Sequence, residues 1–368
     1  FLLCCGSPRG SCCGAPPLMA EEVTKAALPP VARMLAPVGW LGLWLWRTVA
    51  KEHSDSPQAR VLLEGLVFGE SPRWHDGKLY VADVKGKKVV AISAASGVVA
   101  VVEEMPFPSS ISGLGWLPDD RMLVVAMKER QVVCDSQTYA DLAAVSRVQC
   151  NDMVVDSRGR AYVGNFGFDP AHDVPLRMRT TSLVMVDTDQ SVHVVATDLF
   201  FPNGAVITPD GLTLIVAETV AGRLAAFDVV PDSGFLRNRR VWADLGVPPD
   251  GICLDAEGCV WVAVPQIGLY HFLPGGVLRV AEGGAVLQII GFGQNGVRDG
   301  CMACMLRGTH DTATGDEKHT LFVLTAKSTD ERTILRNGPT NNSRLLAFDV
   351  DVGPAKIPGD DRYCAGYC

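Results

Sequence analysis

The stretch NDMVVDSRGRAYVGN at residues 151–165 decides the fold of this chain. An apolar run meets a polar turn built on Asp156 and Gly159, and a second apolar run follows. Short apolar runs on either side of an Asp/Gly turn are typical of a β-hairpin. The unit therefore predicts two antiparallel strands joined by a tight turn.

The same unit recurs along most of the chain. Further copies occupy residues 69–83, 112–127, 203–219 and 250–264, and a degraded copy occupies 303–326. The turn positions, Gly77, Asp120, Gly159, Gly211 and Gly258, lie 39 to 52 residues apart. Hairpins that repeat every 40–50 residues or so are typical of propeller blades. The sequence thus predicts an all-β fold, a six-bladed β-propeller.

The repeat divides the chain into three parts. Residues 1–59 are an N-terminal extension that is expected to be partly disordered, residues 60–352 form the propeller, and residues 353–368 form a C-terminal tail. The last strand, near residues 343–352, is expected to pair with a strand formed just after residue 60. Such pairing closes the ring and removes exposed sheet edges.

The extension contains the apolar stretch LAPVGWLGLWLW at residues 35–46. It is shorter than the roughly 18–20 residues that span a bilayer. Flanking basic residues and three tryptophans suit a membrane interface. Three interpretations stay open: a targeting segment, an interfacial membrane anchor, or a helix packed on the propeller.

Four polar residues break the repeat in the same register. Asn151, Asn203 and Asp250 stand eight residues before their turn positions, as Ser112 does, and Glu70 stands seven before its own. Each opens the first strand of its hairpin, and first strands surround the axis of a propeller. Two carboxylates and two amide oxygens form a set suited to Ca²⁺, with Mg²⁺, Mn²⁺ and Zn²⁺ as alternatives. A single Asx residue before a strand is an ordinary turn former, but four in one register favour a metal site.

The motifs resemble those of a known family. GESPRW, CNDMVVDSRGRAYVG, FPNGAVITPDG and PDGICLDAEGCVWVA are similar to the regucalcin/gluconolactonase (senescence marker protein 30-like) family of six-bladed propeller hydrolases, over about residues 60–352. The resemblance implies that Glu70, Asn203 and Asp250 hold a metal and that Asn151 contacts the metal or the substrate. The resemblance also implies that the sugar lactonases of the family have an Arg two residues before the position that matches Asn151. This chain has Gln149 there, which cannot make a charged, forked contact, so specificity for aldonolactones does not carry over.

These residues predict a divalent-metal-dependent hydrolase of a lactone or related ester, in the EC 3.1 class. The ion would polarise the carbonyl, with Asp250 as candidate base and Asn151 as a second catalytic residue. Asp152 is expected on the opposite strand face, and therefore behind the ligands as a support of the site. The candidate substrate contacts are Gln149, Arg73, Asn165 and His310. Two alternatives stay open: a metal- or partner-binding propeller without catalysis, and a strictosidine-synthase-like propeller, which lacks a comparable ligand set.

Composition narrows the partners and the location. A net charge of −8 and a pI near 5.4 argue against a nucleic-acid partner. The twelve cysteines do not form a disulfide framework, and the Cys301–Cys304 C-x-x-C motif lacks a second pair at the spacing of a structural zinc site. A reducing compartment follows, which predicts a cytoplasmic location. The oligomeric state stays open.

Overall fold

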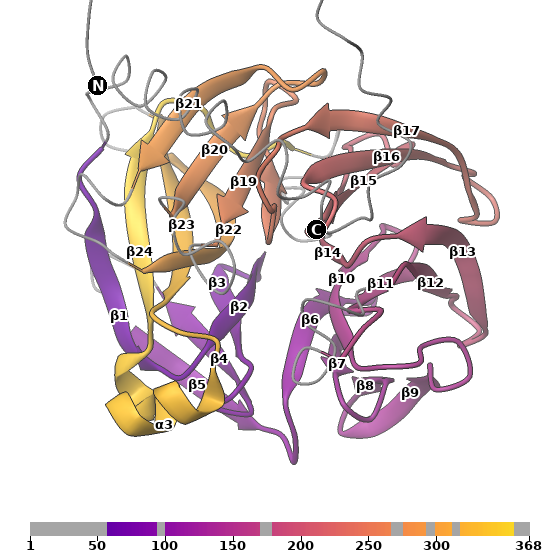
Figure 1. The fold of residues 1–368 in the computed structure, drawn as a ribbon, viewed down its shortest axis with the longest axis horizontal. Helices are drawn as coiled ribbons and strands as arrows, with labels where there is room; N and C mark the ends of the chain where they lie inside the picture. The colour runs from indigo at the N-terminus through magenta and orange to yellow at the C-terminus, as the bar shows by residue number, and fades with distance from the viewer. Residues whose placement is uncertain are drawn as a thin grey trace, which may run out of the picture.

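The computed structural model describes residues 57–93, 100–169, 179–265, 275–291, 299–310 and 317–356. These residues form six sheets of four antiparallel strands, arranged as blades in a ring (Figure 1). The predicted six-bladed propeller is therefore confirmed. The stretch 35–46 and most of the predicted extension and tail lie outside the described residues. None of the described helices is long and apolar enough to cross a membrane.

Each blade begins with an inner strand at the axis of the ring, and consecutive inner strands contact each other. The inner strands are β2 (Gly69–His75), β6 (Ile111–Trp116), β10 (Cys150–Val155), β14 (Pro202–Ile207), β18 (Ile252–Leu254) and β22 (Gly300–His310). The second strands are β3 (Lys78–Asp83), β7 (Met122–Ala126), β11 (Ala161–Asn165), β15 (Thr213–Glu218), β19 (Val260–Val264) and β23 (Glu317–Ala326).

The third and fourth strands complete each blade toward the outside. The third strands are β4 (Lys88–Ser93), β8 (Gln131–Cys134), β12 (Thr181–Val186), β16 (Arg223–Val229), β20 (Gly276–Val280) and β24 (Ser343–Val350). The outer strands are β5 (Ala100–Pro106), β9 (Gln137–Asp141), β13 (Val192–Leu199), β17 (Leu236–Asp244), β21 (Val286–Gly291) and β1 (Arg60–Leu66). A short helix, α3 (Glu331–Asn337), and a 3₁₀ turn, η3 (Pro339–Asn341), connect β23 to β24.

The ring is closed by the two ends of the propeller. β1 pairs antiparallel with β24, so the first described strand becomes the outer strand of the sixth blade. The guanidinium of Arg60 donates two hydrogen bonds, of 2.6 and 2.8 Å, to the carboxylate of Asp349. The predicted closure near residues 343–352 is confirmed.

The hairpin turns explain the Asp/Gly signal of the repeat. Gly77, Gly159, Gly211 and Gly258 have φ between 72° and 90°, a region that glycine enters without steric cost. In the second blade this position is Asp120, with φ 66°, and aspartate is among the few side chains that tolerate such a backbone.

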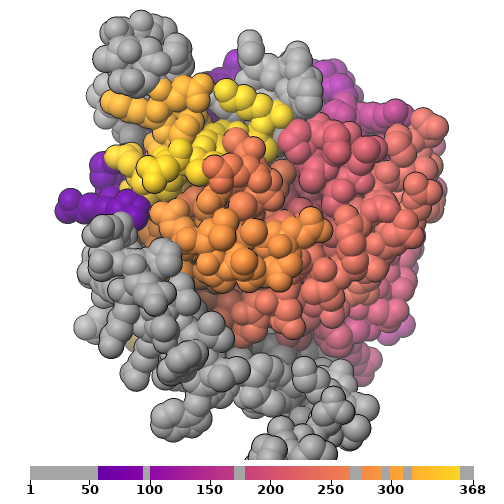
Figure 2. Space-filling view, turned by 90° about the horizontal axis from the view of Figure 1, so that it is seen from above, coloured from indigo at the N-terminus to yellow at the C-terminus, as the bar shows by residue number. Residues whose placement is uncertain are grey.

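The core consists of apolar side chains packed between neighbouring blades. Trp261 and Tyr162 are among the largest fully buried side chains, and each belongs to the second strand of its blade. In the side view of Figure 2, the red fourth blade and orange fifth blade pack directly against each other. Interblade burial of this kind holds the inner strands at fixed relative positions, which is the requirement for a site shared among blades.

Candidate active site

The start of the inner strands brings together side chains from consecutive blades. The Asn151 amide donates to Oδ1 of Asn203 at 2.9 Å, and the Asn203 amide donates to Oδ1 of Asp250 at 2.5 Å. The hydroxyl of Ser112 lies 3.5 Å from Oδ1 of Asn151. A hydrogen-bonded chain therefore crosses from the second blade to the fifth. We call this end of the ring the site end.

Glu70 completes the group from the first blade. Burial and then the charges of Asp250 and Asp152 raise the pKa of its carboxyl well above the usual value. The backbone N–H of Ser71 donates to the same carboxylate at 3.3 Å. The structure thus brings all four residues of the predicted ligand set to one end of the axis.

The carboxyl of Asp250 also has a strongly raised pKa. Its pKa is raised to about 8, because burial and, to a smaller extent, the nearby charge of Asp152 outweigh the hydrogen bond from Asn203, which lowers it. A carboxyl whose pKa lies near neutrality can exchange a proton at physiological pH. The environment of Asp250 therefore suits a general base.

A repeated irregularity presents these side chains. The pairing of the inner strand with the second strand shifts register in five of the six blades, at the start of the inner strand. The shift encloses Ser71, Ser112, Asn151, Asn203 or Met302. Bulges of this kind re-aim side chains beside active sites. In the remaining blade, Asp250 precedes β18 and is held by its N–H bond to the Ala263 carbonyl.

Glycine follows two of the ligands because the next inner strand passes there. A Cβ on Gly204 would lie 2.7 Å from the Asp250 carbonyl oxygen, and one on Gly251 would lie 2.5 Å from Cβ of Ala303. Both distances are shorter than side-chain contacts allow. The N-G and D-G pairs of the motifs therefore combine a ligand with the close approach that brings the next blade to it.

The donor set fits a divalent cation. Among the described residues, neither Glu70 nor Asp250 forms an ion pair. The charge of Asp250 raises the pKa of Glu70, and the charge of Asp152 raises the pKa of both carboxyls. A buried carboxylate beside a half-buried one, neither with a cationic partner, is unfavourable unless protonated or bound to a metal. Asparagine oxygens and carboxylates are ligands that Ca²⁺ accepts. No cluster of three His, Cys, Asp or Glu side chains occurs in the described part of the chain, because half of this set is asparagine.

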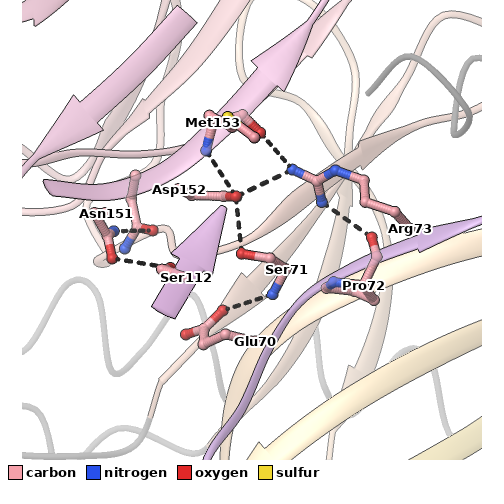
Figure 3. Close-up of polar contacts among 9 residues, drawn as sticks. Glu70, Ser71, Pro72, Arg73, Ser112, Asn151, Asp152 and Met153 are labelled. Carbon is pink, nitrogen blue, oxygen red and sulfur yellow. Dashed lines mark hydrogen bonds and ion pairs between the residues drawn. The ribbon is translucent and has the colours of Figure 1, made fainter. Parts of the chain in front are cut away.

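Behind the ligands, a buried ion pair joins the first and third blades (Figure 3). Asp152 accepts hydrogen bonds from the hydroxyl of Ser71 at 2.8 Å and from the guanidinium of Arg73 at 3.1 Å. The guanidinium also donates to the carbonyls of Pro72 and Met153. Ser71 has φ 48°, a strained backbone for serine. This network holds Ser71, the neighbour of Glu70, against the third blade.

Two of the predicted substrate contacts serve the scaffold. Arg73 is 3% exposed and bound to Asp152, so the structure places it in the support of the site. Asn165 is fully buried; its amide donates to the carbonyl of Ser182, and its side-chain oxygen accepts from Gly167 and Thr181. These hydrogen bonds hold the Arg73 guanidinium and the Asn165 amide against the protein, and not toward a bound substrate.

The other two predicted contacts lie at different ends of the ring. Gln149 is half-buried directly before β10, beside the site. His310 is the last residue of β22, at the far end of the strand from Gly300, and is not brought to the group. A cavity of about 640 Å³ also lies at that far end, lined by hairpin-turn residues such as Pro209 and Gly258. It is separate from the candidate site.

Thr219 is a site residue that sequence reasoning missed. Its hydroxyl accepts from the Asn203 amide at 3.1 Å and donates to the Pro249 carbonyl at 2.8 Å. Thr219 thereby links the Asn203 side chain to the residue that precedes Asp250. Thr219 is the last residue of the repeat unit 203–219. The two strands of a hairpin are antiparallel, so the last residue of the unit lies near the first, Asn203. This relation could have identified Thr219 from the sequence.

The fold and site together define a six-bladed propeller with an oxygen-only polar site where its inner strands begin. A family model described as the SMP-30/gluconolactonase/LRE-like region matches residues 68–327. The chain belongs to this family, as its motifs predict.

Relatives and solved structures agree with this assignment. Regucalcin of Gallus gallus is 30% identical over 207 residues, covering 53% of this chain and 68% of the relative. A pentonolactonase of Haloferax volcanii is 25% identical over 212 residues, covering 55% of this chain and 69% of its own. The structure of regucalcin from Agrobacterium tumefaciens, described as a calcium-binding protein, superposes with TM-score 0.58 at 20% identity, over 80% of this chain and 95% of that one. A gluconolactonase from Xanthomonas campestris superposes with TM-score 0.57 at 21% identity, over 81% and 91%. The two superpositions show the shared fold.

Proposed function

We propose that this protein is a divalent-metal-dependent hydrolase that opens a lactone or a related ester, with Ca²⁺ as its ion. The observation that carries the proposal is the convergence of Glu70 and Asp250, two carboxylates without a cationic partner, with two asparagine side chains at the site end. The pentonolactonase among the relatives supports the reaction class, and the regucalcin structure described as calcium-binding supports the choice of ion. The substrate is a small molecule, and the location and any membrane association through residues 35–46 stay predictions.

The residues of the site have different roles in the proposed reaction. Glu70, Asn151, Asn203 and Asp250 would hold the ion, which supplies charge to polarise the ester carbonyl. Asp250 takes a proton from the attacking water and returns it to the oxygen that leaves when the ester C–O bond breaks. Asn151, held between Ser112 and Asn203, positions the substrate oxygen beside that water. Rigid placement of this kind is worth several orders of magnitude in rate.

Metal removal tests the proposal directly. Purified protein should contain a divalent ion, and elemental analysis identifies whether it is Ca²⁺, Mg²⁺, Mn²⁺ or Zn²⁺. Hydrolysis of a panel of lactones, aryl esters and phosphotriesters should fall at least about tenfold after chelation and return when the ion is restored. Equal rates with and without the ion would refute the metal mechanism. No turnover by either form would leave a metal- or partner-binding propeller.

Ion binding should also remove the pH dependence of stability that the carboxyls of Asp250 and Glu70 cause. Without metal, the folded state binds more protons than the unfolded state between about pH 4 and pH 8, because the pKa values of Asp250 and Glu70 are raised on folding. The melting temperature of chelated protein should therefore fall as pH rises through this window. Saturating Ca²⁺ should cancel the fall, because the ion needs both carboxylates ionised.

Calorimetry from about pH 5 to pH 8, with chelator or with Ca²⁺, measures this effect. Asp250→Asn should flatten the chelated curve, whereas Asp210→Asn, a control at an exposed hairpin turn, should leave it unchanged. Parallel curves with and without Ca²⁺ would show that the ion does not bind these carboxylates.

A further inference from the structure

Three phenylalanine rings gather beside the candidate site. The rings of Phe166 and Phe201 stack with centroids 4.3 Å apart, and Phe168 meets Phe201 edge-on at 5.7 Å and Phe166 at 6.1 Å. Phe166 and Phe168 follow β11 of the third blade, and Phe201 directly precedes β14 of the fourth. We call these three residues the aromatic rim. It lies at the site end, between the blades that supply Asn151 and Asn203.

Hydrogen bonds connect the aromatic rim to the site. The N–H of Phe166 donates to the carbonyl of Gln149 at 3.3 Å, two residues before Asn151. The carbonyl of Phe201 accepts from the N–H of Thr219 at 3.1 Å, and the hydroxyl of Thr219 contacts the Asn203 amide. The rings are therefore held at a fixed place relative to two of the predicted ligands.

The chain keeps Phe201 in this place against its backbone preference. Its φ of 56° is a left-handed conformation that is an outlier for a bulky aromatic residue. Strained residues of this kind persist at ligand sites, where the surrounding structure holds them. Phe168 is buried, but Phe166 and Phe201 stay partly exposed, so an apolar surface remains at the rim.

We infer that the substrate carries an apolar substituent, an alkyl chain or an aromatic ring, which packs on Phe201 and Phe166 while its carbonyl reaches the site. The inference rests on the proposed hydrolase function and specifies its substrate class. Hydroxyl groups of a sugar lactone would lose hydrogen bonds to water against the phenyl rings. The neighbouring Gln149 is uncharged and gives no ionic contact in exchange.

Paired substrates test this inference. Metal-loaded protein should show a kcat/KM at least about tenfold higher for a pentyl-substituted δ-lactone than for unsubstituted δ-valerolactone, and higher again than for glucono-δ-lactone. Phe201→Ala should lower kcat/KM for the pentyl-substituted lactone about tenfold more than it lowers kcat/KM for δ-valerolactone. Phe201→Leu should keep most of the preference. Phe235→Ala is the matched control, since Phe235 is 42% exposed and lies between β16 and β17, away from the site end.

A binding measurement separates this inference from the proposed function. The pentyl-substituted δ-lactam is not hydrolysed, and calorimetric titration should show it binding about tenfold more weakly to Phe201→Ala than to wild type. Turnover of all lactones without preference, or equal lactam binding by both proteins, overturns the inference and leaves the hydrolase. If no lactone is turned over, the hydrolase is overturned, and the lactam titration still decides whether the aromatic rim binds apolar ligands.

Discussion

Asp250→Asn should lower kcat/KM toward the preferred lactone about 10³-fold even at saturating metal. The substitution preserves the shape of the side chain and its acceptor oxygen for the Asn203 amide. It removes the negative charge and the site for the proton that leaves water. The loss should therefore appear in kcat at metal concentrations that restore full occupancy, which steady-state kinetics over a metal titration measures.

Matched variants separate the base from the ligand. Asn203→Ala removes a ligand and the support of Asp250, so part of its loss should be recovered at high metal concentration. Asn341→Ala, an exposed asparagine of η3, should behave as wild type. If high metal restores Asp250→Asn to wild-type turnover, Asp250 is a ligand alone and another group is the base. Because a costly buried charge is removed, the variant should not melt below chelated wild type near pH 8.

Arg73→Met should lower the free energy of unfolding by about 3–5 kcal/mol. The substitution leaves the carboxylate of Asp152 buried with the Ser71 hydroxyl and the Met153 amide but without its cation. An unpaired charge in the interior is far costlier than the pair was favourable. Chemical denaturation measures the loss. A loss of stability is expected, although Arg73 lies beside the candidate site, because its ion pair with Asp152 joins two blades.

Two further variants complete this test. Arg73→Met combined with Asp152→Asn should recover part of the stability, because the stranded charge is gone. Arg60→Met breaks the pair with Asp349, whose side chains are 50% and 71% exposed, and should cost less than about 1 kcal/mol. Equal losses for Arg73→Met and Arg60→Met would contradict the interpretation. A raised KM with unchanged stability would return Arg73 to the role of a substrate contact.

Local sequence signals were enough for the fold and for the composition of the site. The Asp/Gly turns carry their own backbone preference, and the apolar runs on either side bury themselves only as strands. Because the unit repeats, one register places Glu70, Asn151, Asn203 and Asp250 at equivalent positions of different blades. The family then follows from the same motifs.

The roles of Arg73 and Asn165 could not be predicted from local sequence signals. Strict alternation predicts that Asp152 faces away from the ligands, but a bulge at the start of β10 removes that part of the strand from the ladder. Arg73 and Asn165 have the residue types of substrate contacts, and in the folded chain their hydrogen bonds go to the scaffold. Residue type alone does not distinguish these roles.

The sequence by itself determined the repeat, the six blades, the closure of the ring and the common register of the four predicted ligands, because turns and strand periodicity depend on neighbours in the chain. The tertiary structure alone decided that Arg73 and Asn165 hold the scaffold and do not face a substrate. Arg73 and its partner Asp152 lie on different blades. Contacts between such distant segments depend on how whole blades pack, and no local pattern in the chain encodes them.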